Sequence, residues 1–403
     1  MTKQEHQRLA CDLSALTIFR GILEKKPMKA LLSYLKCDKH RSEKMSYYGA
    51  FVHALAPWNY SFSDFLTEAV YEDENPYIIG AAKQNPLPDT LVRNANAELA
   101  LLSELTGLSA ESLTLSAEEG YLPAFDNTKT DFTKTYPMRI REVSRFGYGI
   151  FASGVMFRVV GDEIVAVDTA DTVTVDAFVG YEAERGQVMD NTRALLEGRP
   201  AANILLWGDA GTGKSSTVKA VANHFAPDGL RLIEMRRDQL FSLSAVMGKI
   251  AGNPLKFIIF IDDLSFNKND DCFSMLKAAL EGSASAKADN AVIYATSNRR
   301  HIVKESFSDR SGDDIHAKDT VQELMSLSDR FGLTVCFEKP NKALYLDIVH
   351  TLAARRGLHT DSAALDIRAE AFALARGSRS PRAAEQFVNS MINEENEHER
   401  TDA

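Results

Sequence analysis

The sequence has few cysteines, no long apolar run and no excess of positive charge, and each of these absences argues against a class of protein. Its 403 residues include only four cysteines, none of them in Cys-x-x-Cys spacing. We therefore expect reduced thiols rather than a disulfide framework or a cysteine metal site. No apolar run is long enough to cross a bilayer, and the first residues contain no uninterrupted apolar stretch of a secretory signal. We expect a cytoplasmic protein with no membrane partner.

The charge balance bears on the kind of partner that the protein binds. The formal net charge is −10 at pH 7, which argues against broad electrostatic binding of nucleic acid, although a local basic patch is compatible with a negative total. Hydrophobic residues make up 45% and charged residues 25%, as in ordinary globular proteins with a sizeable core. The length leaves room for about two or three domains.

A glycine-rich turn is the most informative stretch of the chain. It matches the pattern G-x-x-x-x-G-K-[ST], in which glycines let successive backbone N–H groups point inward at a phosphate. An apolar, strand-like segment precedes the turn, and the helix-like segment after it would add its positive N-terminal end. We predict that this turn binds the phosphates of a nucleotide, through Gly208, Asp209, Ala210, Gly211, Thr212, Gly213, Lys214, Ser215 and Ser216.

Two acids follow a second apolar segment, residues 257–261. In an open parallel sheet the ligand lies beyond the carboxyl ends of the strands, so these acids are expected near the glycine-rich turn. Asp262 is placed to hold Mg²⁺ through water together with the Ser215 hydroxyl, and Asp263 to polarise the attacking water. Lys214 is expected to reach the β- and γ-phosphates.

Five short apolar segments alternate with helical patterns and predict a parallel sheet covered on both faces: 203–207, 231–235, 257–261, 291–295 and 333–337. Asn298 follows the fourth segment, where its amide could orient the water or touch the γ-phosphate, or could simply cap a turn. Arg330 precedes the fifth segment and could face solvent, pair with Asp329, or act as an arginine finger.

Two further residues are candidates for the nucleotide site. Arg382 lies in the first turn of a helix that Ser380 would cap and Pro381 would begin. A cation there is unfavourable against the helix dipole, which suggests that an anion lies nearby. Tyr181 immediately precedes another helix upstream of the glycine-rich turn. It is either a plain helix start or a contact for the adenine side of the nucleotide.

The pattern along the chain predicts four parts. Residues 1–135 form a mainly helical domain, and 136–177 form a small β linker element with a hairpin turn at Gly161–Asp162, between strands at 151–160 and 164–167. Residues 178–340 form the α/β nucleotide-binding core. Residues 341–403 form a C-terminal helical lid.

The ordered set of these features resembles that of the AAA+ ATPases over about residues 178–395. The strings GYE, LLWGDAGTGKSS, IDDLSF, YATSNRRH and SLSDRFGL are similar to those of the uncharacterised bacterial family catalogued as domain of unknown function 815. The resemblance implies an α/β P-loop NTPase fold with a five-stranded parallel sheet, a C-terminal helical lid and a mainly helical N-terminal domain. It also implies roles for single residues: Lys214 and Ser215 as Walker A, Asp262 as Walker B, Asn298 as sensor 1, Arg330 as arginine finger and Arg382 as sensor 2.

Asp263 departs from the AAA+ pattern, in which the second acid is glutamate. One methylene less moves the carboxylate away from the water, so that hydrolysis is expected to be slow or to require closure between subunits. Arg299 and Arg300 are another candidate source of positive charge near the γ-phosphate or a subunit boundary. Ion pairs with the acidic segment 305–319 are an equal alternative.

The leading hypothesis is a Mg²⁺-dependent ATPase whose subunits assemble, as a ring, so that Arg330 of one protomer completes the site of the next. Hydrolysis would move the lid and so remodel or load an unknown macromolecular partner. In the alternative, the protein is a slow nucleotide-dependent switch that recruits a partner through residues 1–175. Low turnover despite tight ATP binding would favour the switch.

Several weaker patterns are set aside. Asn267 to Asp270 fits the NKxD guanine motif but lies on the phosphate side, and a small-molecule kinase does not need the two late arginines. Phe241 with Met247-Gly248 gives weak support for a polypeptide-threading loop. The polar insertion 301–326 could bind a partner or a metal, but a solvated loop is the preferred interpretation; its candidate ligands are Asp313, Asp314 and His316.

Overall fold

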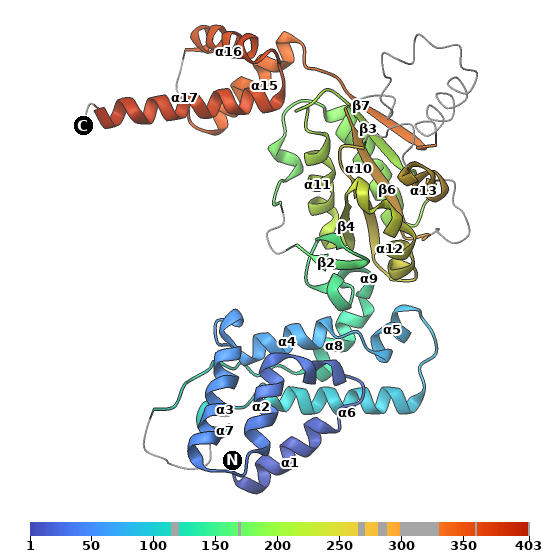
Figure 1. Ribbon diagram of the computed structural model, residues 1–403, viewed down its shortest axis with the longest axis vertical. Helices are drawn as coiled ribbons and strands as arrows, with labels where there is room; N and C mark the ends of the chain where they lie inside the picture. The colour runs from blue at the N-terminus through green and yellow to red at the C-terminus, as the bar shows by residue number, and fades with distance from the viewer. Residues whose placement is uncertain are drawn as a thin grey trace. The chain divides into compact units, whose positions relative to one another are not determined.

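The computed structural model describes residues 1–113, 121–167, 171–264, 271–280, 288–298, 330–358 and 361–401, with 271–273 and 396–401 described by their backbone only (Figure 1). The chain divides into two compact units. The first comprises Met1–Gly154 and Asn253–Leu255, and the second comprises Val155–Gly252 and Lys256–Ala403. Among the described residues, no helix is long and apolar enough to cross a membrane.

The first unit is helical. Its helices are α1 (Lys3–Ser14), η1 (Arg20–Glu24), α2 (Lys26–Lys36), α3 (Arg41–Ala54), η2 (Ala56–Trp58), α4 (Phe62–Glu72), α5 (Pro76–Ala82), α6 (Asp89–Leu105), α7 (Ala110–Leu113), α8 (Phe132–Arg141), α9 (Val143–Phe146) and η3 (Gly149–Ala152). The unit thus includes α8, α9 and η3 in a stretch that the sequence pattern assigned from residue 136 to the β linker element. They surround a shared apolar core that includes Leu13, Phe51, Phe62 and Leu99. The buried Glu98 carboxylate accepts hydrogen bonds from the backbone N–H groups of Thr17 and Phe19, at 2.8 and 2.9 Å, and so fixes the turn after α1.

The second unit contains one sheet of seven strands in the order β2-β1-β4-β5-β6-β3-β7. The strands are β1 (Met156–Val160), β2 (Glu163–Ala166), β3 (Ile204–Gly208), β4 (Leu230–Met235), β5 (Lys256–Ile261), β6 (Ala291–Ser297) and β7 (Leu333–Phe337). All neighbours are parallel except β1 and β2, which form an antiparallel hairpin. The five predicted strands correspond to β3 to β7.

The prediction of a five-stranded sheet is wrong by these two strands. The predicted hairpin forms, but Met156 of β1 pairs with Leu232 of β4, so the hairpin extends the sheet. The predicted first strand also began too early, because Phe151 lies in η3. A hairpin pattern is local and carries no information on which sheet its outer edge will join.

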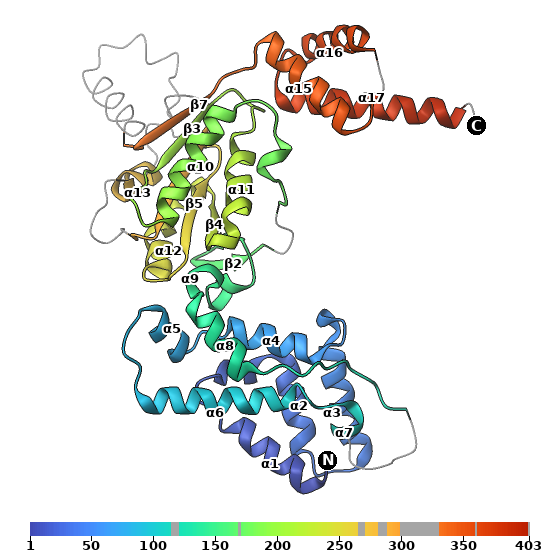
Figure 2. The ribbon, with the colours of Figure 1, turned by 180° about the vertical axis from the view of Figure 1, so that it is seen from behind.

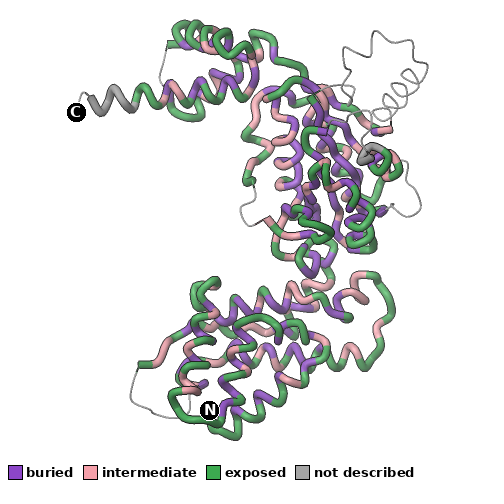
Figure 3. The backbone as a smooth tube through the Cα atoms, viewed as in Figure 1, coloured by how far each residue is buried: buried purple, intermediate pink, exposed green. Residues whose placement is uncertain are grey.

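Helices cover both faces of the sheet (Figures 1 and 2). Successive strand residues point to opposite faces. Ile204 and Leu206 of β3, with Ile258 and Phe260 of β5, pack against α10 (Glu182–Leu196) and α11 (Lys214–Phe225). The opposite face carries α12 (Leu243–Ile250) and α13 (Asp271–Leu280). Buried positions therefore run along the strands, as Figure 3 shows. The described residues of this part also form three short helical turns: η4 (Val175–Ala177), η5 (Ala226–Asp228) and η6 (Arg237–Ser242).

The register of the parallel strands positions the candidate site. Trp207 of β3 pairs with Ser297 of β6, and Ile261 of β5 pairs with Ala295 of the same strand. The carboxyl ends of β3, β5 and β6 therefore lie at one edge of the sheet. The loops that leave these three ends carry the glycine-rich turn, the two acids and Asn298.

Three C-terminal helices pack on one another: α15 (Lys342–Arg355), α16 (Ser362–Arg376) and α17 (Pro381–Thr401). Tyr345, Leu365 and Phe387, one from each helix, belong to their common core. Arg379, just before α17, forms an ion pair with Glu370 of α16 at 2.8 Å. We keep the term lid for these helices, although their movement as a separate domain stays a prediction.

Candidate functional site

The glycine-rich loop connects β3 to α11, and its backbone shape requires glycine. Gly208 has φ +137°, and a Cβ atom there would lie 2.1 Å from the carbonyl oxygen of Phe337. Gly213 adopts a left-handed conformation, with φ +92°, at the N-cap of α11. A side chain at either position would strain the loop or push it away from β7. The pattern of the sequence therefore folds into a tight turn at the N-terminus of a helix.

Lys214 is the buried cation of this loop. Its Nζ atom donates hydrogen bonds to the carbonyl oxygens of Gly208 and Asp209, at 3.0 and 2.7 Å, and to Oδ1 of Asn298, at 3.2 Å. Burial lowers the pKa of Lys214, while the carboxylates of Asp209, Asp262 and Asp263 act in the opposite direction. The lysine thereby joins the end of β3 to the end of β6.

Asp262 accepts hydrogen bonds from groups at the ends of neighbouring strands. Its Oδ1 atom accepts hydrogen bonds from the Ser215 hydroxyl at 2.6 Å, the Thr296 hydroxyl at 2.5 Å and the backbone N–H of Asp263 at 3.1 Å. A carboxylate beside a hydroxyl is a donor set that suits Mg²⁺, which is held by few protein oxygens together with water and phosphate. The described part of the chain contains no cluster of three or more His, Cys, Asp or Glu residues that could enclose a metal.

Asp263 has an unusual backbone and a defined partner. Its φ is +50°, in the left-handed region that residues other than glycine seldom adopt. The backbone N–H of Asp263 donates to the Thr296 hydroxyl at 2.9 Å, which holds this conformation in place. The Nδ2 atom of Asn298 donates to Oδ1 of Asp263 at 3.1 Å. The second acid and the predicted sensor asparagine are thus in direct contact.

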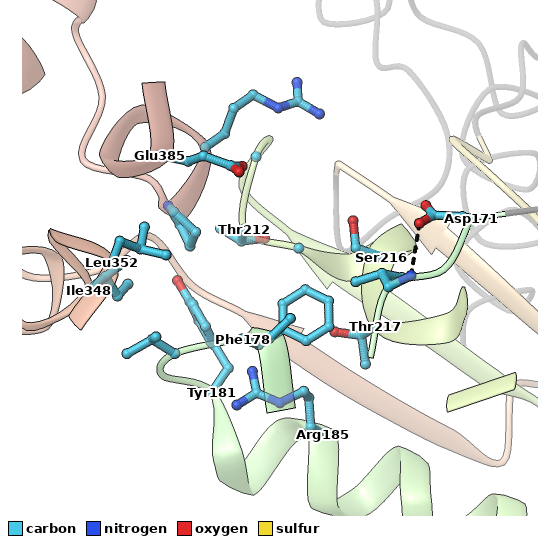
Figure 4. A pocket seen from close by; sticks show the side chains of 17 residues that line it. Asp171, Phe178, Tyr181, Arg185, Thr212, Ser216, Thr217, Ile348, Leu352 and Glu385 are labelled. Atoms are coloured by element: carbon cyan, nitrogen blue, oxygen red, sulfur yellow. Dashed lines mark hydrogen bonds between the residues drawn. The ribbon is translucent and has the colours of Figure 1, made fainter. Parts of the chain in front are cut away.

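A cavity of about 420 Å³ lies beside the loop, between the start of α10, the first turns of α11 and two lid helices (Figure 4). Its lining includes Gly211, Thr212, Gly213, Ser216, Thr217, Phe178, Tyr181, Arg185, Ile348, Leu352 and Arg382. One end is therefore the glycine-rich loop. The remainder combines apolar and aromatic side chains with the charged residues Asp171, Arg185, Arg382 and Glu385. A cavity of this size and lining fits a small molecule with a polar end and a flat apolar end.

Tyr181 lies in the wall of this cavity. Its hydroxyl donates to the carbonyl oxygen of Glu338 at 2.6 Å, and its ring packs against Phe337 with 5.4 Å between centroids. Burial raises the pKa of its hydroxyl. Tyr181 also precedes α10 as its N-cap in a left-handed conformation, with φ +59°. The interpretation as a helix start is confirmed, whereas a contact with adenine stays a prediction.

Arg382 lines the same cavity from α17. Ser380 caps this helix by accepting the backbone N–H of Ala383 at 3.2 Å, and Pro381 is its first residue, as predicted. The backbone N–H of Arg382 donates to the carbonyl oxygen of Gly211 at 3.3 Å. The exposed Arg382 side chain therefore begins directly beside the glycine-rich loop.

Arg330 is not brought to this site in its own chain. It precedes β7, whose first residue Leu333 pairs with Ile204 at the start of β3, whereas Phe337 pairs with Gly208 at the loop. From Leu333 to Phe337 the strand rises roughly 13 Å. Arg330 therefore lies near the opposite edge of the sheet. Other predictions fall outside the described residues, namely those on Arg299, Arg300, Asn267 to Asp270, Asp329 and the insertion 301–326 with Asp313, Asp314 and His316.

The sequence reasoning missed Thr296, Arg185 and the lid residues of the cavity. Thr296 is a buried hydroxyl that contacts both acids, and only its place just before Asn298 at a strand end could have drawn attention to it. Ile348 and Leu352 belong to a helical pattern that predicts core and not cavity. Arg185 lies on α10, and a single arginine in a helical pattern does not indicate a binding residue.

The fold and site define the class of the protein. A glycine-rich loop after one strand, an acid pair after a second and an asparagine after a third meet at one edge of a parallel sheet, and the chain resembles the AAA+ ATPases in this respect. The family model described as "Protein of unknown function (DUF815)" matches residues 154–395, and the chain belongs to this family.

Other comparisons gave either no match or distant matches. No curated protein matches the chain. The solved structures that resemble it include Thermotoga maritima RuvB, titled a Holliday junction branch migration motor, at 13% identity and a TM-score of 0.33, covering 55% of this chain and 71% of that chain. A variant of the same RuvB gives 14% identity and a TM-score of 0.35 over the same shares.

We expect Thr296→Val to lower the free energy of unfolding by about 1 to 3 kcal/mol, because Asp262 loses the hydroxyl donor of Thr296 and the backbone N–H of Asp263 loses one of its two acceptors. Thr296→Ser keeps the hydroxyl and should stay within about 1 kcal/mol of the wild type. Urea unfolding followed by circular dichroism measures both. Equal stability of the valine variant and the wild type would show that Thr296 does not hold the acid pair.

Proposed function

We propose that the protein binds ATP with Mg²⁺ at the carboxyl edge of its sheet and hydrolyses it. The observation that carries this proposal is the hydrogen-bonded group formed by Lys214, Asn298 and Asp263 beside the Ser215–Asp262 pair. These side chains come from three different loops, and a purely structural role would not require a cation, an amide, a hydroxyl and two acids to meet at one exposed edge.

The loop and its lysine would bind the triphosphate. Backbone N–H groups at the start of α11 and the helix dipole favour an anion there. The ammonium group of Lys214 now donates to two loop carbonyls, and phosphate oxygens are stronger acceptors for the same donor. Ser215 and Asp262 would hold Mg²⁺, which supplies charge neutralisation and orientation of the phosphates when bound.

Asp263 and Asn298 would act on the water. The Asp263 carboxylate accepts a proton from the attacking water, and the Asn298 amide keeps that carboxylate in place. Because aspartate is shorter than the usual glutamate, we infer slow turnover. The same observation favours the second candidate function, a nucleotide-dependent switch that binds ATP tightly and recruits a partner with little turnover.

Arg330 and the lid have proposed roles in the assembly of subunits and in acting on a partner. An arginine near the far edge of the sheet cannot serve its own site, but it can serve a neighbouring copy in a ring. Arg382 and the cavity-lining lid helices would sense the nucleotide within the chain. Their movement would act on a macromolecular partner, and the helical first unit is the proposed place for that partner.

Asp263→Asn should abolish turnover without abolishing binding. The amide can still accept the hydrogen bond from Asn298 but cannot take a proton, so we expect hydrolysis to fall roughly 100- to 10,000-fold. Steady-state phosphate release and equilibrium ATP binding measure the two effects. Asp263→Glu restores the longer acid and should keep or raise turnover. Unchanged phosphate release in the asparagine variant would remove Asp263 from the reaction.

Arg330→Ala should prevent ATP-dependent assembly. Light scattering of Asp263→Asn protein with ATP and Mg²⁺ is expected to show growth to a ring, and the added Arg330→Ala change to abolish it. Arg199→Ala is the matched control, because Arg199 precedes β3, close to the same edge of the sheet, and pairs with Glu197 at 2.5 Å. A protein that binds ATP and stays monomeric would contradict the shared site and leave the switch.

A further inference from the structure

The cavity beside the glycine-rich loop contains a buried arginine that the proposed reaction does not use. Among the described residues that line the cavity, the basic side chains are Arg185 and Arg382. Arg382 is exposed, whereas Arg185 is only 7% exposed. Burying a charged group is unfavourable unless polar partners replace the water that it loses. A buried guanidinium such as that of Arg185 therefore requires polar partners.

The contacts of Arg185 within the described chain are few. Its Nη2 atom donates to Oε1 of Glu182 at 3.3 Å, but that glutamate side chain is 76% exposed. Its guanidinium lies 5.4 Å from the ring centroid of Phe178. A guanidinium has five N–H donors in a planar fork, and one bond to an exposed carboxylate uses only part of this capacity. Burial accordingly lowers the pKa of Arg185.

The position of Arg185 in the cavity indicates which part of a nucleotide it would meet. Gly211, Thr212 and Gly213 line the end where phosphate would bind. Figure 4 shows Arg185 away from this end, beneath Phe178 and next to Tyr181, with Ile348 and Leu352 projecting from the lid. Apolar and aromatic side chains of this kind suit the faces of a flat ring. A buried donor among them suits an acceptor on the edge of that ring.

We propose that Arg185 is a specificity-determining residue that donates a hydrogen bond to a ring acceptor of the purine base. This inference rests on the proposed binding of a nucleotide and adds the group that recognises its base. Adenine presents ring nitrogens as acceptors, and guanine presents N7 together with O6, which an arginine fork can meet at once. The adenine amino group, a donor, cannot be the partner.

Arg193 provides a matched control on the same helix. It has an acidic partner three residues earlier, Asp190 at 2.7 Å, and its guanidinium lies 5.8 Å from the ring centroid of Phe225. Arg185 has the same two kinds of contact. The difference is that the Arg193 side chain is 46% exposed and lies outside the cavity lining.

Isothermal titration of ATP into wild type, Arg185→Met and Arg193→Met proteins tests the inference. Because the bond from a charged donor would be lost in a buried site, we expect Arg185→Met to weaken ATP binding roughly 10- to 100-fold. Arg193→Met should stay within about twofold of the wild type. The same titrations are made with 7-deaza-, 3-deaza- and 1-deaza-ATP, each of which lacks one ring acceptor.

One deaza analogue should bind the wild type more weakly by a similar factor and show no further loss in Arg185→Met, because the two changes remove the same bond. If Arg185→Met weakens the binding of ATP and of all three analogues by the same factor, or weakens the binding of none, the inference is overturned. If Arg185→Met fails to fold, the analogue series on the wild type still tests the inference, because equal binding of ATP and all three deaza analogues would overturn it. GTP that binds more tightly than ATP, with the preference lost in Arg185→Met, would support the role of Arg185 and contradict only the choice of adenine. A wild type that binds no nucleotide would refute the proposed function itself.

Discussion

The buried ammonium group of Lys214 is the interaction on which the candidate site depends. It donates to the backbone of the loop after β3 and to the side chain that follows β6, and Asn298 in turn contacts the acid that follows β5. A desolvated lysine needs such partners, because an unpaired ammonium would lose its charge or disrupt the fold. The same requirement makes it a strong donor for any phosphate that enters the loop. The proposed binding and the local structure thus rest on one group.

The second constraint is the hydroxyl of Thr296, which links the two acids. It donates to Asp262 and accepts from the backbone of Asp263, which has a left-handed conformation. Asp262 is thereby held facing Ser215, while Asp263 faces Asn298. Two neighbouring carboxylates obtain different surroundings in this way, which is the usual means by which similar acids acquire separate tasks. The division of labour proposed for them follows from this geometry.

The sequence was informative where structure depends on local pattern. The strands β3 to β7, the glycine-rich loop and the Ser380 cap of α17 follow from apolar runs, glycine spacing and capping residues. It was silent where structure depends on register. The pairing of β1 with β4 made the sheet wider than predicted, and Thr296 and Arg185 acquire their contacts only through strands and helices that meet in space. The role of Arg330 at a neighbouring copy remains a prediction.

The central claim is that the group around Lys214 binds the phosphates of ATP. Titration calorimetry of ATP with and without Mg²⁺ on the wild type, Lys214→Met and Lys219→Met tests it most directly. Lys219 is the control on α11, partly exposed and 3.9 Å from Glu234. We predict binding that Mg²⁺ tightens in the wild type and in Lys219→Met, with a loss of about tenfold or more in Lys214→Met. Undetectable binding to the wild type, or equal binding to Lys214→Met, would contradict the claim.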